Sequence, residues 1–215
     1  MNTNKIINSF SSWKNEHLKY KKILIIAIFF VILSNTINFY AGTYVSKLKV
    51  ESVPDLILNN FGPYDLNFLF GFGFIIILTV TYLYPFLFEV KLFHKVLFQT
   101  SILITIRAFF ICLTHLQIPS DATQVHFPII FGNFLFQNDL FFSGHVALTF
   151  LGFFIFEKKQ IKIFFLISSI LMGFVVLGMH QHYSIDVFAA FFITYTSFKI
   201  GEYIIKIIKK NNNLN

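Results

Sequence analysis

Charged residues are scarce in this chain of 215 residues, of which only 13% are Asp, Glu, Lys or Arg. Hydrophobic residues make up 56%, and the mean hydropathy is +0.70. This apolar share is well beyond that of a soluble globular domain, so the composition excludes one and predicts a membrane protein. The length allows one domain, because each helix that crosses the hydrocarbon core needs roughly 20 residues.

Cysteine is nearly absent as well: Cys112 is the only one, so no intramolecular disulfide can form. It falls inside an apolar stretch, where we expect it to serve as a small packing residue. A small-residue cleavage motif is also missing after the first apolar segment, which begins at Ile23. We therefore expect that segment to be a retained signal anchor.

Six apolar segments together predict an all-α polytopic membrane protein with six transmembrane helices in one bundle. The predicted spans are residues 23–45, 66–88, 96–116, 140–156, 163–179 and 183–205. They divide the chain into a basic N-terminal segment, 1–22, a membrane catalytic domain, 23–205, and a basic, Asn-rich tail, 206–215. We expect the repeated Asn at 211–213 to be disordered.

Basic residues are distributed unequally between the two ends of the predicted spans. Fourteen lysines lie before the first span, after the second and fourth, or near the end of the chain, whereas Lys47 and Lys49 follow the first span. The positive-inside rule therefore places both termini in the cytosol. The loop at 117–138 then lies on the non-cytosolic face, where its composition suits the lipid interface. Because membrane orientation explains the net charge of +7, we expect no nucleic-acid partner.

Two short polar segments, 139–145 and 180–186, adjoin apolar spans on that non-cytosolic face, and we expect them to form two halves of one active site. In the second segment His182 and Asp186 are four residues apart, so they share a helix face. A carboxylate behind an imidazole fixes its tautomer and stabilises the charge gained on attack, which makes His182 a candidate nucleophile. The alternative is that the two side chains only hydrogen-bond to each other at the start of the helix.

The first segment contains Ser143-Gly144-His145 at the start of the fourth span. Free backbone N–H groups and the positive helix end favour an anion there, and glycine permits close approach by a phosphate. An imidazole at this position, His145, would protonate a leaving alkoxide. An ordinary helix cap is the alternative. The expected substrate-binding residues of the two segments are Asp139, Ser143, Gly144, His180 and Tyr183.

Arg107 lies within the third predicted span and is the only arginine of the chain. An arginine inside the membrane must face a polar cavity or a partner. Its planar fork suits phosphate oxygens, so Arg107 is a candidate anchor for a charged lipid head group. A structural ion pair with Asp139 or Asp186 is the alternative.

The outer side is also rich in histidine, with His115, His126 and His180. Magnesium would need carboxylates, for which only Asp121, Asp139 and Asp186 are present on that side. A zinc site built from His180, His182 and His145 is geometrically conceivable. We nevertheless expect neither a metal nor another cofactor.

These residues resemble a known family. The pattern Asp139-x-x-Phe142-Ser143-Gly144-His145, followed by His180-x-His182-Tyr183-Ser184-x-Asp186-Val187, is similar to the paired motifs of sphingomyelin synthases. Arg107, with Thr114 seven residues later and Leu116 nine later, resembles a stretch of that family's third span. Sphingomyelin synthases are a branch of the type 2 phosphatidic acid phosphatase superfamily, and the resemblance covers roughly residues 96–194.

The resemblance implies that His182 attacks phosphorus, that Asp186 orients it, and that His145 acts as general acid and then as base. It also implies a covalent phosphohistidine intermediate and no metal. These roles agree with those inferred from the residues alone.

Departures from the superfamily pattern concern the substrate. The hydrolase branch carries a Lys seven residues before an Arg-Pro pair, whereas here Thr100 and Ala108 stand at those positions. It also carries Ser-Arg six residues before its nucleophilic His, where this chain has Val175-Val176. A phosphate monoester approaches two negative charges at neutral pH and a diester carries one, so a site with fewer cations favours the diester. The stretch at 194–196 lacks the Arg of the synthases, so the head group stays open.

The sequence therefore predicts a lipid phosphotransferase that passes a phospho-head group from a phospholipid to a lipid alcohol. A lipid phosphate phosphatase with the same catalytic residues is the alternative. A third interpretation is a membrane carrier or channel whose His, Asp and Arg form a proton or anion path. Against it, the polar residues gather on one face, and neither a broken-helix pair nor an inverted repeat is evident.

Overall fold

The computed structural model describes residues 3–126, 136 and 138–211, and every regular element within them is helical. The elements are α1 (Thr3–Lys19), α2 (Lys21–Ser46), a 3-10 turn η1 (Leu58–Asn60), a π turn η2 (Leu69–Gly73), α3 (Phe74–Phe88), α4 (Val90–Leu113), α5 (Gly144–Ile155), α6 (Lys159–Gly178) and α7 (Ser184–Asn211). The prediction of an all-α chain is confirmed for these residues. Most of the loop at 127–137, and the tail beyond Asn211, lie outside the described residues, so the expectations for them stay predictions.

Each of the six predicted apolar segments coincides with one of the helices α2 to α7. Within the described part of the chain, four helices are long and apolar enough to cross a membrane: Lys21–Ser46, Leu69–Phe88, Val90–Leu113 and Lys159–Gly178. α5 is apolar as well but has only 12 residues. These helices indicate an integral membrane protein, while the count of six crossings stays a prediction.

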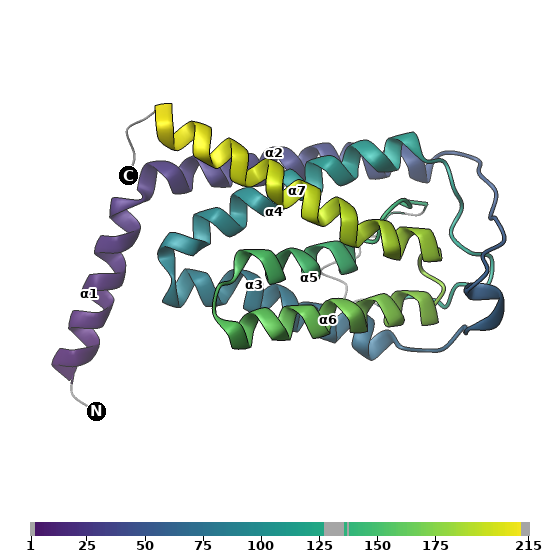
Figure 1. Cartoon of the computed structure of the whole chain (residues 1–215), viewed down its shortest axis with the longest axis horizontal. Helices are drawn as coiled ribbons and strands as arrows, with labels where there is room; N and C mark the ends of the chain where they lie inside the picture. Colours follow the sequence, from purple (N-terminus) through teal and green to yellow (C-terminus); the bar gives the residue numbers. More distant parts are fainter. Residues whose placement is uncertain (1–2, 127–135, 137, 212–215) are drawn as a thin grey trace.

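The helices α2 to α7 run back and forth between the two ends of one bundle (Figure 1). The beginnings of α5 and α7 and the ends of α4 and α6 lie at the same end, together with the long connections after α2 and α4. We call this the loop end. The start of α2 and the end of α7 lie at the opposite end, from which α1 projects (Figure 1).

The N-terminal segment is helical, although the sequence analysis assigned it no structure. Its tryptophan attaches it to the bundle: Trp13 Nε1 donates a hydrogen bond of 3.0 Å to the carbonyl oxygen of Phe86, near the end of α3. The two rings also pack edge to face, with centroids 5.5 Å apart. α1 is therefore joined to the bundle at the end opposite the loop end.

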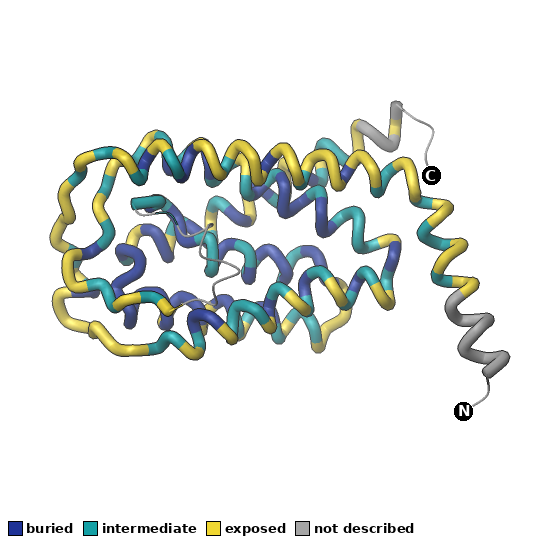
Figure 2. Tube along the Cα trace, turned by 180° about the vertical axis from the view of Figure 1, so that it is seen from behind, coloured by how far each residue is buried: buried dark blue, intermediate teal, exposed yellow. Residues whose placement is uncertain are grey.

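α5 is the central helix and packs against α6, α7 and α4. Its side chains Val146, Ala147 and Leu151 are buried. At Gly152 an added side chain would overlap the ring of Phe165, so glycine allows α5 and α6 to approach closely. Figure 2 shows the buried residues gathered in the inner helices and exposed residues along α2.

The exposed surface of α2 is strongly apolar. Phe29 is 58% exposed and Ile32 is 61% exposed, although both are large hydrophobic side chains. An apolar face of this kind is unfavourable in water and suits contact with lipid acyl chains. The burial pattern thus agrees with the composition in indicating a membrane environment.

At the end opposite the loop end, an ion pair joins the connection between α3 and α4 to the connection between α5 and α6. Lys158, between α5 and α6, lies 2.5 Å from the Glu89 carboxylate between α3 and α4. Its ammonium also donates to the hydroxyl of Tyr84 at 2.6 Å, and Tyr84 donates to Glu89 at 3.0 Å. The hydrogen bonds to Glu89 and then Tyr84 raise the pKa of Lys158 above its ordinary value.

Candidate active site

Backbone strain is concentrated at the two polar segments. Among the described residues, positive φ occurs outside glycine at Asn138 (61°), Phe141 (83°), Phe142 (48°) and His180 (55°). Each of these residues lies in or next to one of the segments. Such conformations cost of order 1–3 kcal/mol each and are typical of functional sites, where the surrounding structure holds them in place.

His182 lies in the turn that leads into α7 and Asp186 lies in the first turn of that helix, and the predicted contact between them is present. Nδ1 of His182 is 3.2 Å from Oδ2 of Asp186, and both side chains are buried. The same oxygen accepts the backbone N–H of Tyr183 at 3.1 Å, so Asp186 caps its own helix while it binds the imidazole. A hydrogen bond to a carboxylate requires a proton on Nδ1, which leaves the lone pair of a neutral ring on Nε2.

The two polar segments meet through the backbone. The N–H of Ser143 donates to the carbonyl oxygen of Asp186 at 3.1 Å. Ser143 occupies the N-cap position of α5, yet its hydroxyl makes no capping hydrogen bond. The alternative that this serine is an ordinary side-chain cap therefore does not hold. The N-terminus of α5 lies beside the first turn of α7, as Figure 1 shows.

The ring of His145 packs against two aromatic rings, that of Phe70 in η2 and that of Phe74, the first residue of α3. Its ring centroid lies 4.2 Å from that of Phe70 and 4.2 Å from that of Phe74. Both His182 and Arg107 are within electrostatic reach of it. This packing restricts the orientation of the imidazole.

Arg107 reaches from α4 to the start of α5. One guanidinium nitrogen donates to the Asp139 carboxylate at 2.9 Å and to the Asp139 carbonyl oxygen at 2.8 Å. Of the two ion pairs left open by the sequence, the structure contains the one with Asp139. The guanidinium also lies against Gly144, where an added Cβ would come within 3.2 Å of Nε. The ion pair and a phosphate-binding role are compatible, because Nε stays available.

Several polar atoms at this site are buried without a hydrogen-bond partner. Arg107 Nε, Ser143 Oγ and His145 Nε2 can each donate, and Asp186 Oδ1 can accept. Buried polar atoms are nearly always paired, so a cluster of unpaired donors requires an explanation. An anion with several oxygens would satisfy the three donors together.

Comparison with known proteins gives one match. Residues 138–203 match the model described as the PAP2 superfamily C-terminal domain. The match supports the PAP2 superfamily. It includes both polar segments, α5, α6 and most of α7, while Arg107 lies outside it. No curated protein and no solved structure matches the chain.

This match and the apolar helices fit a membrane-bound lipid phosphatase or phosphotransferase, since PAP2 superfamily members are enzymes of these two kinds. Lipid substrates and a membrane location fit the same two observations.

His180 and Tyr183, two residues predicted to bind substrate, point into the connections at the loop end. Nε2 of His180 lies 2.6 Å from the carbonyl oxygen of Phe61, and Nδ1 lies 2.9 Å from the Asp121 carboxylate, at an angle poor for a hydrogen bond. The Tyr183 hydroxyl donates to the Gln117 carbonyl at 2.8 Å and accepts the backbone N–H of residue 53 at 3.1 Å. Both side chains therefore have their hydrogen-bond partners in the loops, and not among the buried unpaired donors of the site.

Asp55 is a residue that no sequence motif connects to the site. It lies in the connection after α2, and its carboxylate accepts hydrogen bonds from Ser184, the first residue of α7. Burial alone would raise the pKa of this carboxyl, but its hydrogen bonds, first those from Ser184, hold it below its ordinary value. The one available signal was an Asp directly after a Pro in a polar loop, which is typical of any turn.

No group of three or more His, Cys, Asp or Glu side chains within the described residues is arranged to hold a metal ion. The conceived zinc site required His180 beside His182 and His145. The ring of His180 faces Phe61 and Asp121 instead.

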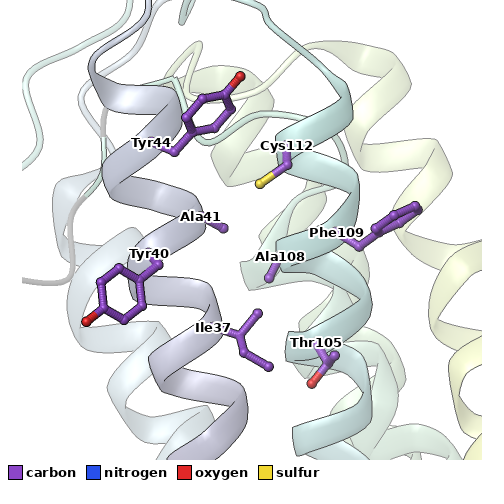
Figure 3. Close-up of a pocket in the computed structure, with 8 residues that line it drawn as sticks. All are labelled: Ile37, Tyr40, Ala41, Tyr44, Thr105, Ala108, Phe109 and Cys112. Carbon is purple, nitrogen blue, oxygen red and sulfur yellow. The ribbon is translucent and has the colours of Figure 1, made fainter.

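Two apolar grooves lie away from this cluster. One, of about 490 Å³, lies between α2 and α4 and is lined by Ile37, Tyr40, Ala41, Tyr44, Thr105, Ala108, Phe109 and Cys112 (Figure 3). The other, of about 570 Å³, lies between α4 and α7. Neither is lined by a predicted catalytic residue, so we base no chemistry on them.

Proposed function

We propose that this protein is an integral membrane lipid phosphotransferase that moves a phospho-head group from a phospholipid to a lipid alcohol, in the manner of sphingomyelin synthases. The observation that carries the proposal is the group of unpaired buried donors, Arg107 Nε, Ser143 Oγ and His145 Nε2. A phosphate supplies the oxygens that these donors lack. The neighbouring His182–Asp186 pair supplies a nucleophile for its phosphorus.

In the first step, Nε2 of His182 attacks phosphorus and an N–P bond forms. The bond between phosphorus and the lipid alcohol oxygen breaks, and the departing alkoxide takes a proton from Nε2 of His145, which begins the cycle as an imidazolium and becomes neutral. Asp186 remains ionised and stabilises the positive charge that His182 gains. The product of this half-reaction is a phosphohistidine with the head group still attached.

In the second step, the hydroxyl of a lipid alcohol attacks the phosphorus of the phosphohistidine. His145, now neutral, removes the hydroxyl proton while the N–P bond breaks. Both imidazoles return to their starting protonation states, so atoms and charge balance over the cycle without a cofactor.

The charge of the site favours a phosphodiester over a monoester. Arg107 is the only arginine of the chain, and its charge is partly neutralised by the Asp139 carboxylate at 2.9 Å. At the positions where the hydrolase branch carries further cations, the chain has Thr100 and Val175-Val176, all buried in the bundle. A site with this few positive charges suits a substrate with one negative charge.

We further propose that the site faces the non-cytosolic side of the membrane. All the proposed catalytic residues lie at the loop end, whereas the basic turn at Lys158 and Lys159 lies at the other end. The positive-inside rule assigns that basic end to the cytosol.

The competing function is a lipid phosphate phosphatase, since the PAP2 superfamily contains both kinds of enzyme. Purified protein is incubated with a phospholipid labelled in its head group and with a lipid alcohol. Transfer gives a labelled lipid product that depends on the alcohol, and hydrolysis gives a water-soluble label. We expect the labelled lipid, and its complete loss in His182→Ala; turnover that survives in this variant would remove the proposed nucleophile.

A further inference from the structure

Asp55 binds the first residue of α7 although 129 residues separate the two in sequence. Its Oδ2 accepts the backbone N–H of Ser184 at 2.8 Å and the Ser184 hydroxyl at 2.8 Å. Its Oδ1 accepts the N–H groups of Ile57 at 2.9 Å and Leu58 at 3.2 Å. One carboxylate thus fastens the connection after α2 to the start of the helix that carries Asp186.

The start of α7 needs such a partner. The residue before Ser184 is Tyr183, whose phenol cannot fold back to cap the helix. Asp186 accepts the N–H of Tyr183 and the imidazole of His182 through one oxygen, so it does not serve Ser184. An Asp from a distant part of the chain therefore accepts the N–H of the first helical residue, which has no partner within the helix, and its negative charge also suits the positive end of the helix.

A second contact joins the same two stretches. The backbone N–H of Val53, two residues before Asp55, donates to the Tyr183 hydroxyl at 3.1 Å. Tyr183 and Ser184 directly follow His182, so the two contacts hold the chain on the C-terminal side of the proposed nucleophile. A shift of this turn would change the direction of the His182 ring relative to phosphorus.

We propose that Asp55 is a positioning residue for phosphoryl transfer: by binding Ser184 it fixes the turn that aims Nε2 of His182. The inference rests on the proposed function. Displacement of a reacting group by about 1 Å can slow a reaction by about 100-fold, so the effect should fall on turnover rather than on substrate binding. None of the hydrogen bonds described for Asp55 involves Arg107 or Ser143, which bind the phosphate in the proposed mechanism.

The test compares Asp55→Asn with Asp65→Asn, a matched control in the same connection. Asp65 also accepts hydrogen bonds from a neighbour two residues on, Asn67, but its bonds are confined to that neighbour. Head-group transfer is measured for the full-length protein in detergent, with separate values of kcat and KM and a thermal unfolding curve. We expect Asp55→Asn to lower kcat about tenfold or more and to change KM less than about twofold. Asp65→Asn should match the wild type in both.

Ser184→Ala is the second variant, because it removes only the hydroxyl donor and leaves the backbone bond to Asp55. It should lower kcat by a smaller factor, and it serves as the test if Asp55→Asn does not fold. In the Ser184→Ala background, Asp55→Asn should lower kcat by a smaller factor than in the wild type, because the two residues act through one contact.

The outcomes separate the two proposals. If the wild type transfers the head group and His182→Ala does not, but Asp55→Asn or Ser184→Ala behaves like Asp65→Asn, the positioning role is wrong and the function stands. A rise in KM at unchanged kcat would also overturn it. If His182→Ala keeps full turnover, the proposed function fails whatever Asp55 does.

Discussion

The backbone N–H of Ser143 donates to the carbonyl oxygen of Asp186 at 3.1 Å, across 43 positions of sequence. This bond joins the start of α5 to the first turn of α7. It brings the N-terminus of one helix, an end that favours anions, beside the imidazole–carboxylate pair of the other. The proposed chemistry depends on this juxtaposition, since donors from α5 must hold the phosphate that His182 attacks.

The first prediction concerns the carboxylate behind His182. Asp186→Asn keeps the shape of the side chain but removes the negative charge and can stabilise the wrong tautomer of the imidazole. We expect kcat for head-group transfer to fall by about 10²- to 10⁴-fold. Glu202→Gln, which removes another carboxylate of α7, is the control, because Glu202 pairs with Lys95 far from the site. Equal activity of the two variants would mean that Asp186 has no part in catalysis.

The second prediction concerns the planar fork of Arg107. Arg107→Lys keeps a positive charge, but a lysine cannot donate to Asp139 and to a phosphate with the same geometry. We expect kcat/KM to drop about tenfold or more, with the larger loss in Arg107→Met. Lys95→Met on the same helix removes a cation that faces Glu202 and should leave kcat/KM unchanged. If Arg107→Lys retains wild-type kinetics, the proposed role of Arg107 in binding Asp139 and a phosphate at the same time is wrong.

Hydropathy alone predicted the helical class and the positions of α2 to α7. Lipid-exposed and core residues of a membrane helix are both apolar, so each of these helices appears in the sequence as a long run of apolar residues. Hydropathy missed the helical state of α1, which is polar and gives no such run. The spacing of His182 and Asp186 predicted their contact, since residues four apart on a helix are neighbours.

Other features of the site depend on contacts between distant stretches and leave no local signal. The loop partners of His180 and Tyr183 come from residues 53, 61, 117 and 121, so no spacing within their own motif could indicate them. Asp55 is equally invisible from sequence, because an Asp in a turn is common and only the fold brings it to Ser184. The substrate-binding roles predicted for His180 and Tyr183 stay predictions, while the hydrogen bonds of both side chains hold the loops.

The third prediction concerns Gly62, which lies against His180. Its φ is +99°, a region that disfavours other residues, and an added Cβ would come within 2.7 Å of His180 Nε2. We expect Gly62→Ala to lower the free energy of unfolding by about 2 kcal/mol, measured as a lower unfolding temperature in detergent. Gly71→Ala is the control, because nothing lies within 4 Å of a Cβ there. A stable Gly62→Ala variant would show that the contact between Phe61 and His180 tolerates displacement.

The fourth prediction concerns acid sensitivity of the same contact. The contact with the His180 ring, whose Nδ1 lies 2.9 Å from the carboxylate, holds the pKa of the Asp121 carboxyl below its ordinary value of 3.8. A lowered folded-state pKa means that the stabilisation is complete above about pH 4 and is lost as the pH falls through the folded value. Because Asp121 is 57% exposed, the contribution should be at most about 1 kcal/mol.

Unfolding temperatures of the wild type and Asp121→Asn should therefore differ slightly at pH 6 and converge toward pH 3. Asp65→Asn serves for comparison, since the Asp65 carboxyl also has a lowered pKa, caused by its bonds to Asn67, but does not contact His180. A difference between wild type and Asp121→Asn that grows on acidification would contradict the assigned direction.

The last prediction concerns the orientation of the bundle. In a Cys112→Ser background, single cysteines replace two exposed residues, Lys49 at the loop end and Gln160 at the opposite end. Since the fourteen lysines of the basic end favour the cytosol, a membrane-impermeant maleimide should label Lys49→Cys in intact cells and Gln160→Cys only after permeabilisation. The reverse pattern would place His145, His182 and Asp186 on the cytosolic face. The substrates would then have to be lipids of the inner leaflet, while the catalytic steps proposed for these residues would be unchanged, because those steps depend on contacts within the bundle and not on the side from which lipid enters.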